Sequence, residues 1–247
     1  MDCLIVGAGE MGRWVGETLA GRFTVAYADS DAAAAERAAG ATGGRVAGDG
    51  ERFDAVCLAV PIPALAAAVR EHSPRAERAV WDVTGTMGPT VAAMREHAPD
   101  RERLSTHPLF APEAAPGRVP VVQDAPGPVT DAVRAALAAA GNELFETDPE
   151  EHDRAMATVQ ARAHAAVLAF GLAREEVPER FQTPVSAALS ELVERVTSGN
   201  PRVYADVQAA FEGADDVAEA AARVADAEGA AFERLYREAR EPSGGEP

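Results

Sequence analysis

The sequence contains no lysine. All 23 basic residues are arginine, 40 residues are aspartate or glutamate, and the formal net charge is −17. Without lysine the protein cannot form a Schiff base through a side-chain amine, use a lysine general base or build a P-loop phosphate site. An anionic chain of this kind also argues against nucleic-acid binding, because phosphates are neutralised by clustered positive charge.

Cysteine and long apolar runs are also scarce. The two cysteines, Cys3 and Cys57, both lie in apolar, strand-like segments, which favours buried reduced thiols over a disulfide framework. No apolar run approaches the roughly 20 residues that span a bilayer, and no secretory signal precedes the first strand-like run. We therefore expect a cytoplasmic protein without a membrane partner.

Short apolar runs alternate with alanine-rich helical patterns over residues 1–148, which predicts stacked β-α units and a parallel sheet. The expected strands are Cys3–Val6, Thr24–Ala28, Ala55–Val60, Ala79–Val83, Leu104–His107, Val119–Val122 and Glu143–Phe145. The expected helices between them are Met11–Ala20, Ala32–Ala39, Ala64–Glu71, Thr90–His97 and Val129–Ala140. The proline-rich segment 111–128 is expected to be largely extended or loop.

Amphipathic helices replace the strands over residues 149–240. The expected helices are Glu150–Ala173, Val185–Val196, Pro201–Glu212 and Val217–Arg240. This all-helical domain has too little chain to bury its own apolar faces, so we expect it to form a homodimer. The small polar tail, 241–247, is expected to be disordered.

A glycine-rich loop follows the first expected strand and opens a helix. Its residues are Gly7, Ala8, Gly9, Glu10, Met11 and Gly12. The three glycines suit a tight turn, a close backbone approach to a pyrophosphate, and close packing of helix on strand. Such a motif alone is weak, and a glycine turn without a ligand is the alternative. The strand–turn–helix context favours a Rossmann-type, doubly wound sheet that binds a dinucleotide.

Asp29 ends the second expected strand, 22 residues after Gly7. A carboxylate at this distance binds the adenine-ribose hydroxyls. It would repel a 2′-phosphate, and the nearest arginine downstream is Arg37, so we expect NAD rather than NADP. Val60, Pro61 and Asp82 follow other strands and should line the same crevice, although any parallel sheet would offer similar residues.

His107 is the most informative histidine, because it ends an expected strand at the carboxyl edge that faces the cofactor. An imidazole there can accept a hydrogen bond from a substrate hydroxyl as the carbon that bears this hydroxyl loses hydride. His72 and His97 lie at helix ends, where charge complementarity with the helix dipole explains them better. We expect no metal.

Three polar residues of the helical half are weaker candidates. Gln160 and His164 are four residues apart and share a helix face, but a solvated face or a dimer contact would explain them equally well. His152, earlier on the same helix, is turned partly away and is interpreted as helping the helix to start. Arg195 lies near the end of the next helix, where an ion pair with Glu191 is the alternative.

Three motifs resemble those of the prephenate dehydrogenase family. The first is Thr106-His107-Pro108-Leu109-Phe110-Ala111-Pro112, with alanine where the family has glycine. The second runs from Glu150-Glu151-His152-Asp153-Arg154 through Met156 and Gln160-Ala161 to His164. The third is Arg195 followed by Tyr204-Ala205-Asp206. The resemblance covers nearly the whole chain.

This resemblance implies an NAD-dependent oxidoreductase of tyrosine biosynthesis that converts prephenate to 4-hydroxyphenylpyruvate with loss of carbon dioxide. His107 would be the catalytic histidine and would bond the 4-hydroxyl of the substrate. Arg195 would bind a substrate carboxylate, and His164 and Gln160 would line the pocket. Members of the family are commonly dimers through the helical domain.

Two positions depart from the family pattern. The family has a serine three residues after Asp82 and a lysine five residues after it, whereas this chain has Gly85 and Met87. Thr84 or Thr86 could supply the missing hydroxyl to the substrate. Arogenate as substrate, or a non-catalytic NAD-binding redox-sensing module, are the alternatives.

The acidic composition predicts a response to salt. If it reflects adaptation to high salt, added potassium chloride should raise the melting temperature, because a Debye length of about 3 Å at 1 M screens the repulsion between surface carboxylates. Thermal unfolding over a potassium chloride series measures this. A melting temperature that does not rise would instead favour a GC-rich genome that has replaced lysine with arginine.

Overall fold

The computed structural model describes residues 1–240, which divide into two compact units. The first unit is Met1–Ala155, and the second begins at Met156. The boundary that the sequence predicts, after residue 148, therefore falls inside the first unit. The predicted tail, 241–247, lies outside the described residues. Among residues 1–240, no helix is both long and apolar enough to cross a membrane.

The first unit is built on one eight-stranded sheet with the order β3-β2-β1-β4-β5-β6-β7-β8. The strands are β1 (Asp2–Val6), β2 (Thr24–Ala28), β3 (Arg45–Val46), β4 (Phe53–Leu58), β5 (Ala76–Asp82), β6 (Glu102–Thr106), β7 (Arg118–Ala125) and β8 (Glu143–Glu146). Strands β1 to β6 run parallel in the order of a doubly wound Rossmann-type sheet, as predicted. The switch point lies between β1 and β4, where the winding reverses.

Strand β7 pairs antiparallel with β6, which corrects the expectation of a parallel sheet at this end. The connection between them holds only the short 3-10 turn η3 (Pro112–Ala114). A parallel pair needs a longer crossover, usually with a helix, so the chain turns back instead. The backbone N–H groups of His107 and Leu109 donate to the carbonyl oxygens of Pro120 (3.3 Å) and Arg118 (3.0 Å), both in β7. The segment that carries His107 is thereby fixed to β7.

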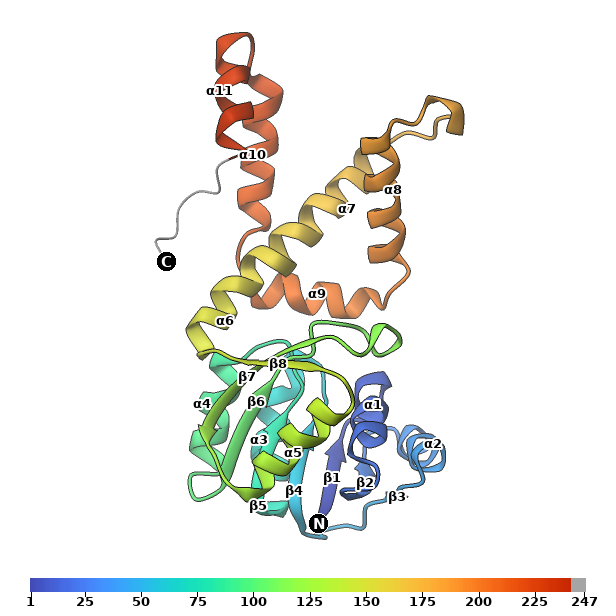
Figure 1. Ribbon diagram of the computed structural model, residues 1–247, viewed down its shortest axis with the longest axis vertical. Helices are drawn as coiled ribbons and strands as arrows, with labels where there is room; N and C mark the ends of the chain where they lie inside the picture. The colour runs from blue at the N-terminus through green and yellow to red at the C-terminus, as the bar shows by residue number, and fades with distance from the viewer. Residues whose placement is uncertain (241–247) are drawn as a thin grey trace. The chain divides into compact units, whose positions relative to one another are not determined.

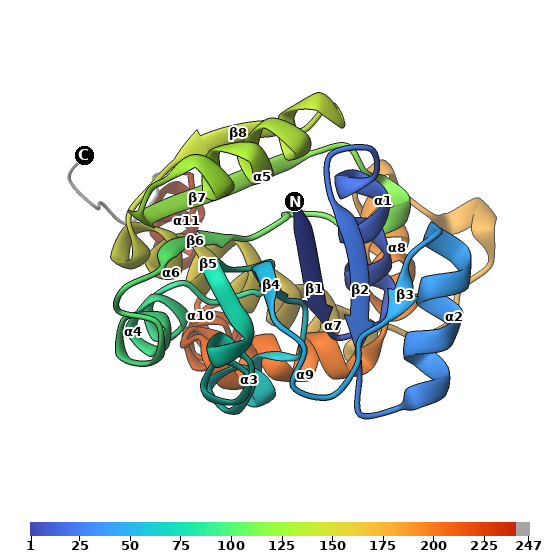
Figure 2. The same cartoon turned by 90° about the horizontal axis from the view of Figure 1, so that it is seen from below.

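Helices cover both faces of the sheet (Figures 1 and 2). They are α1 (Glu10–Leu19), α2 (Ala32–Thr42), α3 (Leu65–His72), α4 (Gly88–His97) and α5 (Pro128–Ala139), with 3-10 turns η1 (Ile62–Ala64) and η2 (Ser73–Arg75). Helix α6 (Pro149–Met156) follows β8. Alternate strand residues form two cores: Cys3 and Ile5 pack with α1, α2 and α5, whereas Leu4 and Val6 pack with α3 and α4. Both cysteines are free and fully buried, as predicted, and burial raises the pKa of Cys3 to about 12.

The second unit is helical, as predicted. It contains the π-helix η4 (Ala157–Arg162), α7 (Ala163–Ala173), η5 (Glu179–Phe181), α8 (Pro184–Thr197), α9 (Pro201–Ala210), α10 (Ala214–Asp226) and α11 (Ala230–Glu238). Helices α7 and α8 lie side by side (Figure 1). The prediction of a single helix over Val217–Arg240 is wrong, because the helix is interrupted between the end of α10 and the start of α11. Gly229 has a φ of +51° there, a conformation that glycine adopts without strain.

Few apolar side chains of the second unit are buried in the single chain. Val193, Val207 and Phe211 are buried, whereas Leu172 is 90% exposed and Val185 is 71% exposed. Large apolar side chains left in water favour association with another surface.

Candidate active site

The glycine loop forms a cradle at the switch point of the sheet. Gly7 has a φ of +97°, and a Cβ atom there would lie 2.2 Å from the carbonyl oxygen of Ala59, beyond the end of β4. A Cβ atom on Gly12 would lie 1.9 Å from the carbonyl oxygen of Gly7. No side chain fits at either position. A Cβ atom on Gly9, by contrast, would meet no atom within 4 Å, which leaves room beside this backbone for a ligand.

The open space beside Gly9 lies at the N-terminus of α1. Gly9 caps this helix, whose first residues are Glu10 and Met11. The first amide groups of a helix lack partners within it and attract anions, so this end suits a pyrophosphate. Val60 is half-buried and Pro61 is exposed, and both follow β4 on the other side of the switch point. The residues present therefore fit a dinucleotide.

Asp29 fixes the shape of this loop. One carboxylate oxygen accepts from the backbone N–H of Ala8 at 2.7 Å, and the other accepts from that of Asp31 at 2.9 Å. The half-buried carboxylate lies just past the end of β2, where the sequence places a ribose ligand. Arg37 pairs with Asp31 at 3.3 Å rather than with Asp29.

Asp82 orders the loop that follows β5. Its side chain is fully buried and accepts from the backbone N–H of Thr84 at 2.9 Å and from the Thr84 hydroxyl at 2.5 Å. Burial raises the pKa of Asp82 to about 7, against hydrogen bonds that lower it. A buried carboxylate of this kind positions the loop rather than contacting a ligand, so its predicted cofactor contact gains no support.

The hydroxyls of Thr84 and Thr86 also point into the protein interior, toward other polar side chains. The Thr84 hydroxyl donates to Asp82, the Thr86 hydroxyl lies 3.4 Å from that of Thr90, and both threonines are 4% exposed. Their predicted contact with substrate gains no support either. Gly85, between them, is closely packed, because a Cβ atom there would lie 3.1 Å from Cδ1 of Ile62.

His107 directly follows β6 and is 8% exposed. Its Nε2 atom faces Gly85, because a Cβ atom there would lie 3.8 Å from it. Its Nδ1 atom lies 3.0 Å from Nε2 of His152. Burial lowers the pKa of His107 to about 3, nearby His152 lowers it further, and Asp153 acts in the opposite direction. The imidazole is therefore neutral at physiological pH, as a proton acceptor must be.

His152 and Asp153 were missed as functional residues by the sequence analysis. His152 is 2% exposed, and its Nδ1 atom lies 2.8 Å from a carboxylate oxygen of Asp153. Asp153 also accepts from the backbone N–H groups of Met87 (3.0 Å) and Gly88 (2.9 Å), where α4 begins. Burial works against ionisation of Asp153, but the hydrogen bonds from His152 and these two amides lower its pKa. The sequence signal that could have found them is their place in the motif Glu150-Glu151-His152-Asp153-Arg154.

The candidates of the second unit lie on three of its helices. His164, on α7, packs edge-on against the ring of Tyr204 with centroids 4.8 Å apart, so two of the sequence motifs meet. Burial lowers the pKa of His164. Gln160 lies in the π-helix η4, an irregularity frequent at functional sites. Arg195 is exposed near the end of α8 and forms no ion pair within residues 1–240, which removes the alternative of a bridge to Glu191.

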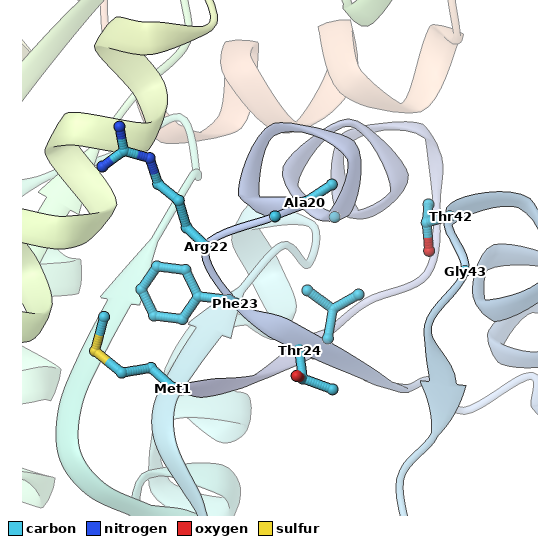
Figure 3. Close-up of a pocket in the computed structure, with 10 residues that line it drawn as sticks. Met1, Ala20, Arg22, Phe23, Thr24, Thr42 and Gly43 are labelled. Carbon is cyan, nitrogen blue, oxygen red and sulfur yellow. The ribbon is translucent and has the colours of Figure 1, made fainter.

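A pocket at the other edge of the sheet is not part of this site. It is lined by residues around the starts of β1 and β2, including Met1, Phe23 and Thr24, and by the end of α2 (Figure 3). The glycine cradle and His107 lie instead where the parallel strands end.

The fold and these residues define a class of protein. A glycine cradle at the switch point and a neutral, buried imidazole at the same sheet edge are the parts of a nicotinamide-dependent dehydrogenase. The nucleotide-binding domain of prephenate dehydrogenase matches residues 20–121, and the dimerization domain of prephenate dehydrogenase matches residues 148–231. The chain belongs to the prephenate dehydrogenase family, and its first unit is an NAD-binding domain, as predicted.

Individual relatives differ in their substrates. The chain is 33% identical to a 4-amino-4-deoxyprephenate dehydrogenase of Streptomyces pristinaespiralis, over 90% of this chain and 81% of that protein. Its fold resembles a prephenate dehydrogenase of A. aeolicus in complex with hydroxyphenyl propionate and NAD+ (TM-score 0.73, 18% identity, 98% of this chain and 93% of that one). It also resembles a Synechocystis arogenate dehydrogenase (TM-score 0.63, 15% identity, 97% and 98%).

The raised pKa of Asp82 predicts a pH-dependent stability. The pKa rises from an ordinary value of 3.8 to about 7, so the folded state binds more protons than the unfolded state within this window. The contribution of Asp82 to stability therefore falls as pH rises through it. Asp82→Asn removes this titration and keeps an oxygen for Thr84.

We therefore expect the melting temperature of Asp82→Asn, relative to that of the unchanged protein, to increase from pH 5 to pH 8. Thermal unfolding without cofactor at both pH values measures the difference. Asp100→Asn, at an exposed site, is the control and should show no such trend. A difference for Asp82→Asn that is constant or decreases with pH would contradict the account.

Proposed function

We propose that this protein catalyses the NAD-dependent oxidative decarboxylation of prephenate to 4-hydroxyphenylpyruvate. The observation that carries the proposal is the position of His107. Its Nε2 atom lies toward Gly85, in the loop after β5, and its Nδ1 atom contacts Nε2 of His152. The ring is thus oriented, neutral and placed at the sheet edge where the glycine cradle lies.

The cofactor would be held by the cradle and by Asp29. The pyrophosphate would lie against Gly9 and the first amides of α1, and Asp29 would bind the adenine ribose while it keeps Ala8 in place. NAD bound there supplies the acceptor for hydride from the substrate. The ion pair of Arg37 with Asp31 leaves no arginine assigned to a 2′-phosphate, which supports NAD over NADP.

The substrate would be activated by His107 and held by residues of the helical unit. His107 accepts the proton of the 4-hydroxyl as hydride leaves the same carbon, and loss of carbon dioxide then makes the ring aromatic. Arg195 binds a substrate carboxylate, for which a guanidinium has the matching geometry. His164 and Gln160 line the pocket.

A second candidate substrate is 4-amino-4-deoxyprephenate. The 33% identical relative is named as a dehydrogenase of this compound. A neutral imidazole accepts a proton from an amino group as it does from a hydroxyl. Arogenate is the third option, and its side-chain amine calls for an acidic partner that we do not assign.

The exposed apolar surface of the second unit supports a homodimer. Side chains such as Leu172 and Val185 would be covered by the same unit of a second copy, in keeping with the match to the family's dimerization domain. A symmetric pair covers such surfaces on both chains at once.

Substitution of His107 tests the chemistry. Purified protein with NAD is given prephenate, 4-amino-4-deoxyprephenate or arogenate, and NADH formation is followed by absorbance. We expect turnover of prephenate, and a kcat about 10²–10⁴-fold lower in His107→Asn with its melting temperature nearly unchanged. His97→Asn, at the end of α4, is the control. Equal activity in His107→Asn would remove His107 from the mechanism, and no turnover of any substrate would favour a non-catalytic module.

Substitution of Arg195 tests substrate binding separately. Loss of a charge-assisted bond worth about 1.5–3 kcal/mol should raise the KM for prephenate roughly 10- to 100-fold in Arg195→Gln. The Kd for NAD, measured by calorimetry, should not change. Arg174→Gln, an exposed arginine at the end of α7, should leave both values as they are. An unchanged KM in Arg195→Gln would end the assignment.

A further inference from the structure

Two residues beyond the predicted site control the chemistry of His107. We infer that Asp153, acting through His152, keeps a proton on Nδ1 of His107 and so makes Nε2 the atom that accepts the substrate proton. The inference rests on the proposed function for its consequence in catalysis. The arrangement of protons itself does not depend on any substrate.

The series of hydrogen bonds that leads to His107 begins at the first backbone amides of α4. The N–H groups of Met87 and Gly88 can only donate, and both point at Asp153, one to each carboxylate oxygen. Asp153 must therefore present oxygens that accept. The positive end of the α4 dipole and these two hydrogen bonds favour the ionised carboxylate. An ionised carboxylate has no proton to donate to anything else.

The second step concerns His152. Its Nδ1 atom lies 2.8 Å from the same oxygen of Asp153 that Met87 contacts. Since the carboxylate can only accept, Nδ1 of His152 must carry the proton. A neutral imidazole carries one proton, so its Nε2 atom is left as an acceptor. At 2% exposure, the ring has little water to offer an alternative partner.

The third step reaches the reacting atom. Nε2 of His152 lies 3.0 Å from Nδ1 of His107. Because Nε2 of His152 accepts, Nδ1 of His107 must donate, and the lone pair of the neutral ring is then on Nε2. This atom faces Gly85. A backbone feature at the start of α4 thus sets the protonation of an atom two side chains away.

The same chain of groups can move charge during the reaction. The substrate hydroxyl gives its proton to Nε2 of His107 as hydride leaves C4, and bound NAD would be the acceptor of that hydride. The Nδ1 proton of His107 can then move to Nε2 of His152, which becomes a cation in contact with the Asp153 carboxylate. His107 is neutral again, and the ring carboxylate leaves as carbon dioxide. Asp153 and His152 are positioning residues in this scheme, because neither contacts the substrate.

The first experiment measures the protons directly. Protein labelled with ¹⁵N in its histidines, without cofactor or substrate, is studied by long-range ¹H–¹⁵N correlation at pH 7.5. The ¹⁵N shifts separate a protonated from an unprotonated ring nitrogen, and the variants His107→Asn and His152→Gln assign the signals. We expect both rings to carry their proton on Nδ1. A proton on Nε2 of either ring would overturn the inference without any variant having to fold.

The second experiment removes the charge that sets the order. In Asp153→Asn, the amide nitrogen must face one of the donors, at Met87 and His152 or at Gly88, so the proton on Nδ1 of His107 is no longer enforced. We expect His107 to shift toward the Nε2–H form and kcat to fall about 10²–10⁴-fold with KM changed less than about threefold. Glu150→Gln removes the same charge from an exposed position of α6 and should change neither.

The two experiments separate this inference from the proposed function. The predicted protonation with no dehydrogenase activity would contradict the function and leave the inference standing. Dehydrogenase activity together with a proton on Nε2 of either ring would overturn the inference and leave the function standing. Activity together with an unchanged His107 spectrum in Asp153→Asn would do the same. If Asp153→Asn lowers the melting temperature strongly, the wild-type spectrum alone still decides.

Discussion

The carboxylate of Asp153, held by two backbone amides at the start of α4, is the contact on which the arrangement of this site depends. A helix start has amide groups without partners, and a buried carboxylate needs donors, so each satisfies the other. The contact joins α4 to α6, although 65 residues separate Gly88 from Asp153. It also places His152 in contact with His107, which directly follows β6. The loop after β5, the end of β6 and the start of α6 are thereby held together.

Two further devices fix the same sheet edge. The antiparallel strand β7 binds the backbone of His107 and Leu109, so the segment after β6 cannot move freely. The ring of Phe110, from the same motif, packs edge-on against Trp14 of α1 with centroids 5.4 Å apart. This contact ties the histidine segment to the helix that the glycine loop opens. Cofactor cradle and imidazole are therefore parts of one connected sheet edge rather than separate sites.

The sequence predicted what depends on local pattern and on parallel-sheet geometry. The strands β1, β2, β4, β5 and β6, the glycine cradle and the place of His107 follow from apolar runs, glycine spacing and the rule that ligands bind at the carboxyl ends of strands. The two-residue edge strand β3 was missed, because Arg45 and Val46 form no apolar run. The break before α11 was missed because a single glycine in an alanine-rich helical pattern does not by itself predict a turn. The antiparallel direction of β7 was missed, although the lack of a helix between β6 and β7 is what excludes a parallel crossover.

Contacts between distant residues were beyond the reach of the sequence. His152 was interpreted as helping its helix to start, because nothing local indicates that a ring 45 residues earlier contacts it. Thr84 and Thr86 were candidates for a hydroxyl that substrate would meet, but the burial of Asp82 nearby turns the Thr84 hydroxyl inward. In both cases the deciding fact is which polar group must be satisfied inside the protein, and that depends on three-dimensional packing.

A crystal structure of the protein with NAD and a 4-hydroxyphenyl substrate analogue tests the central claim most directly. The account predicts the phenol oxygen about 2.7–3.0 Å from Nε2 of His107, the His107–His152–Asp153 contacts unchanged, and a guanidinium of Arg195, from the same or a partner subunit, on the analogue's carboxylate. An analogue bound away from His107, or a His107 ring turned so that Nδ1 faces the ligand, would contradict it.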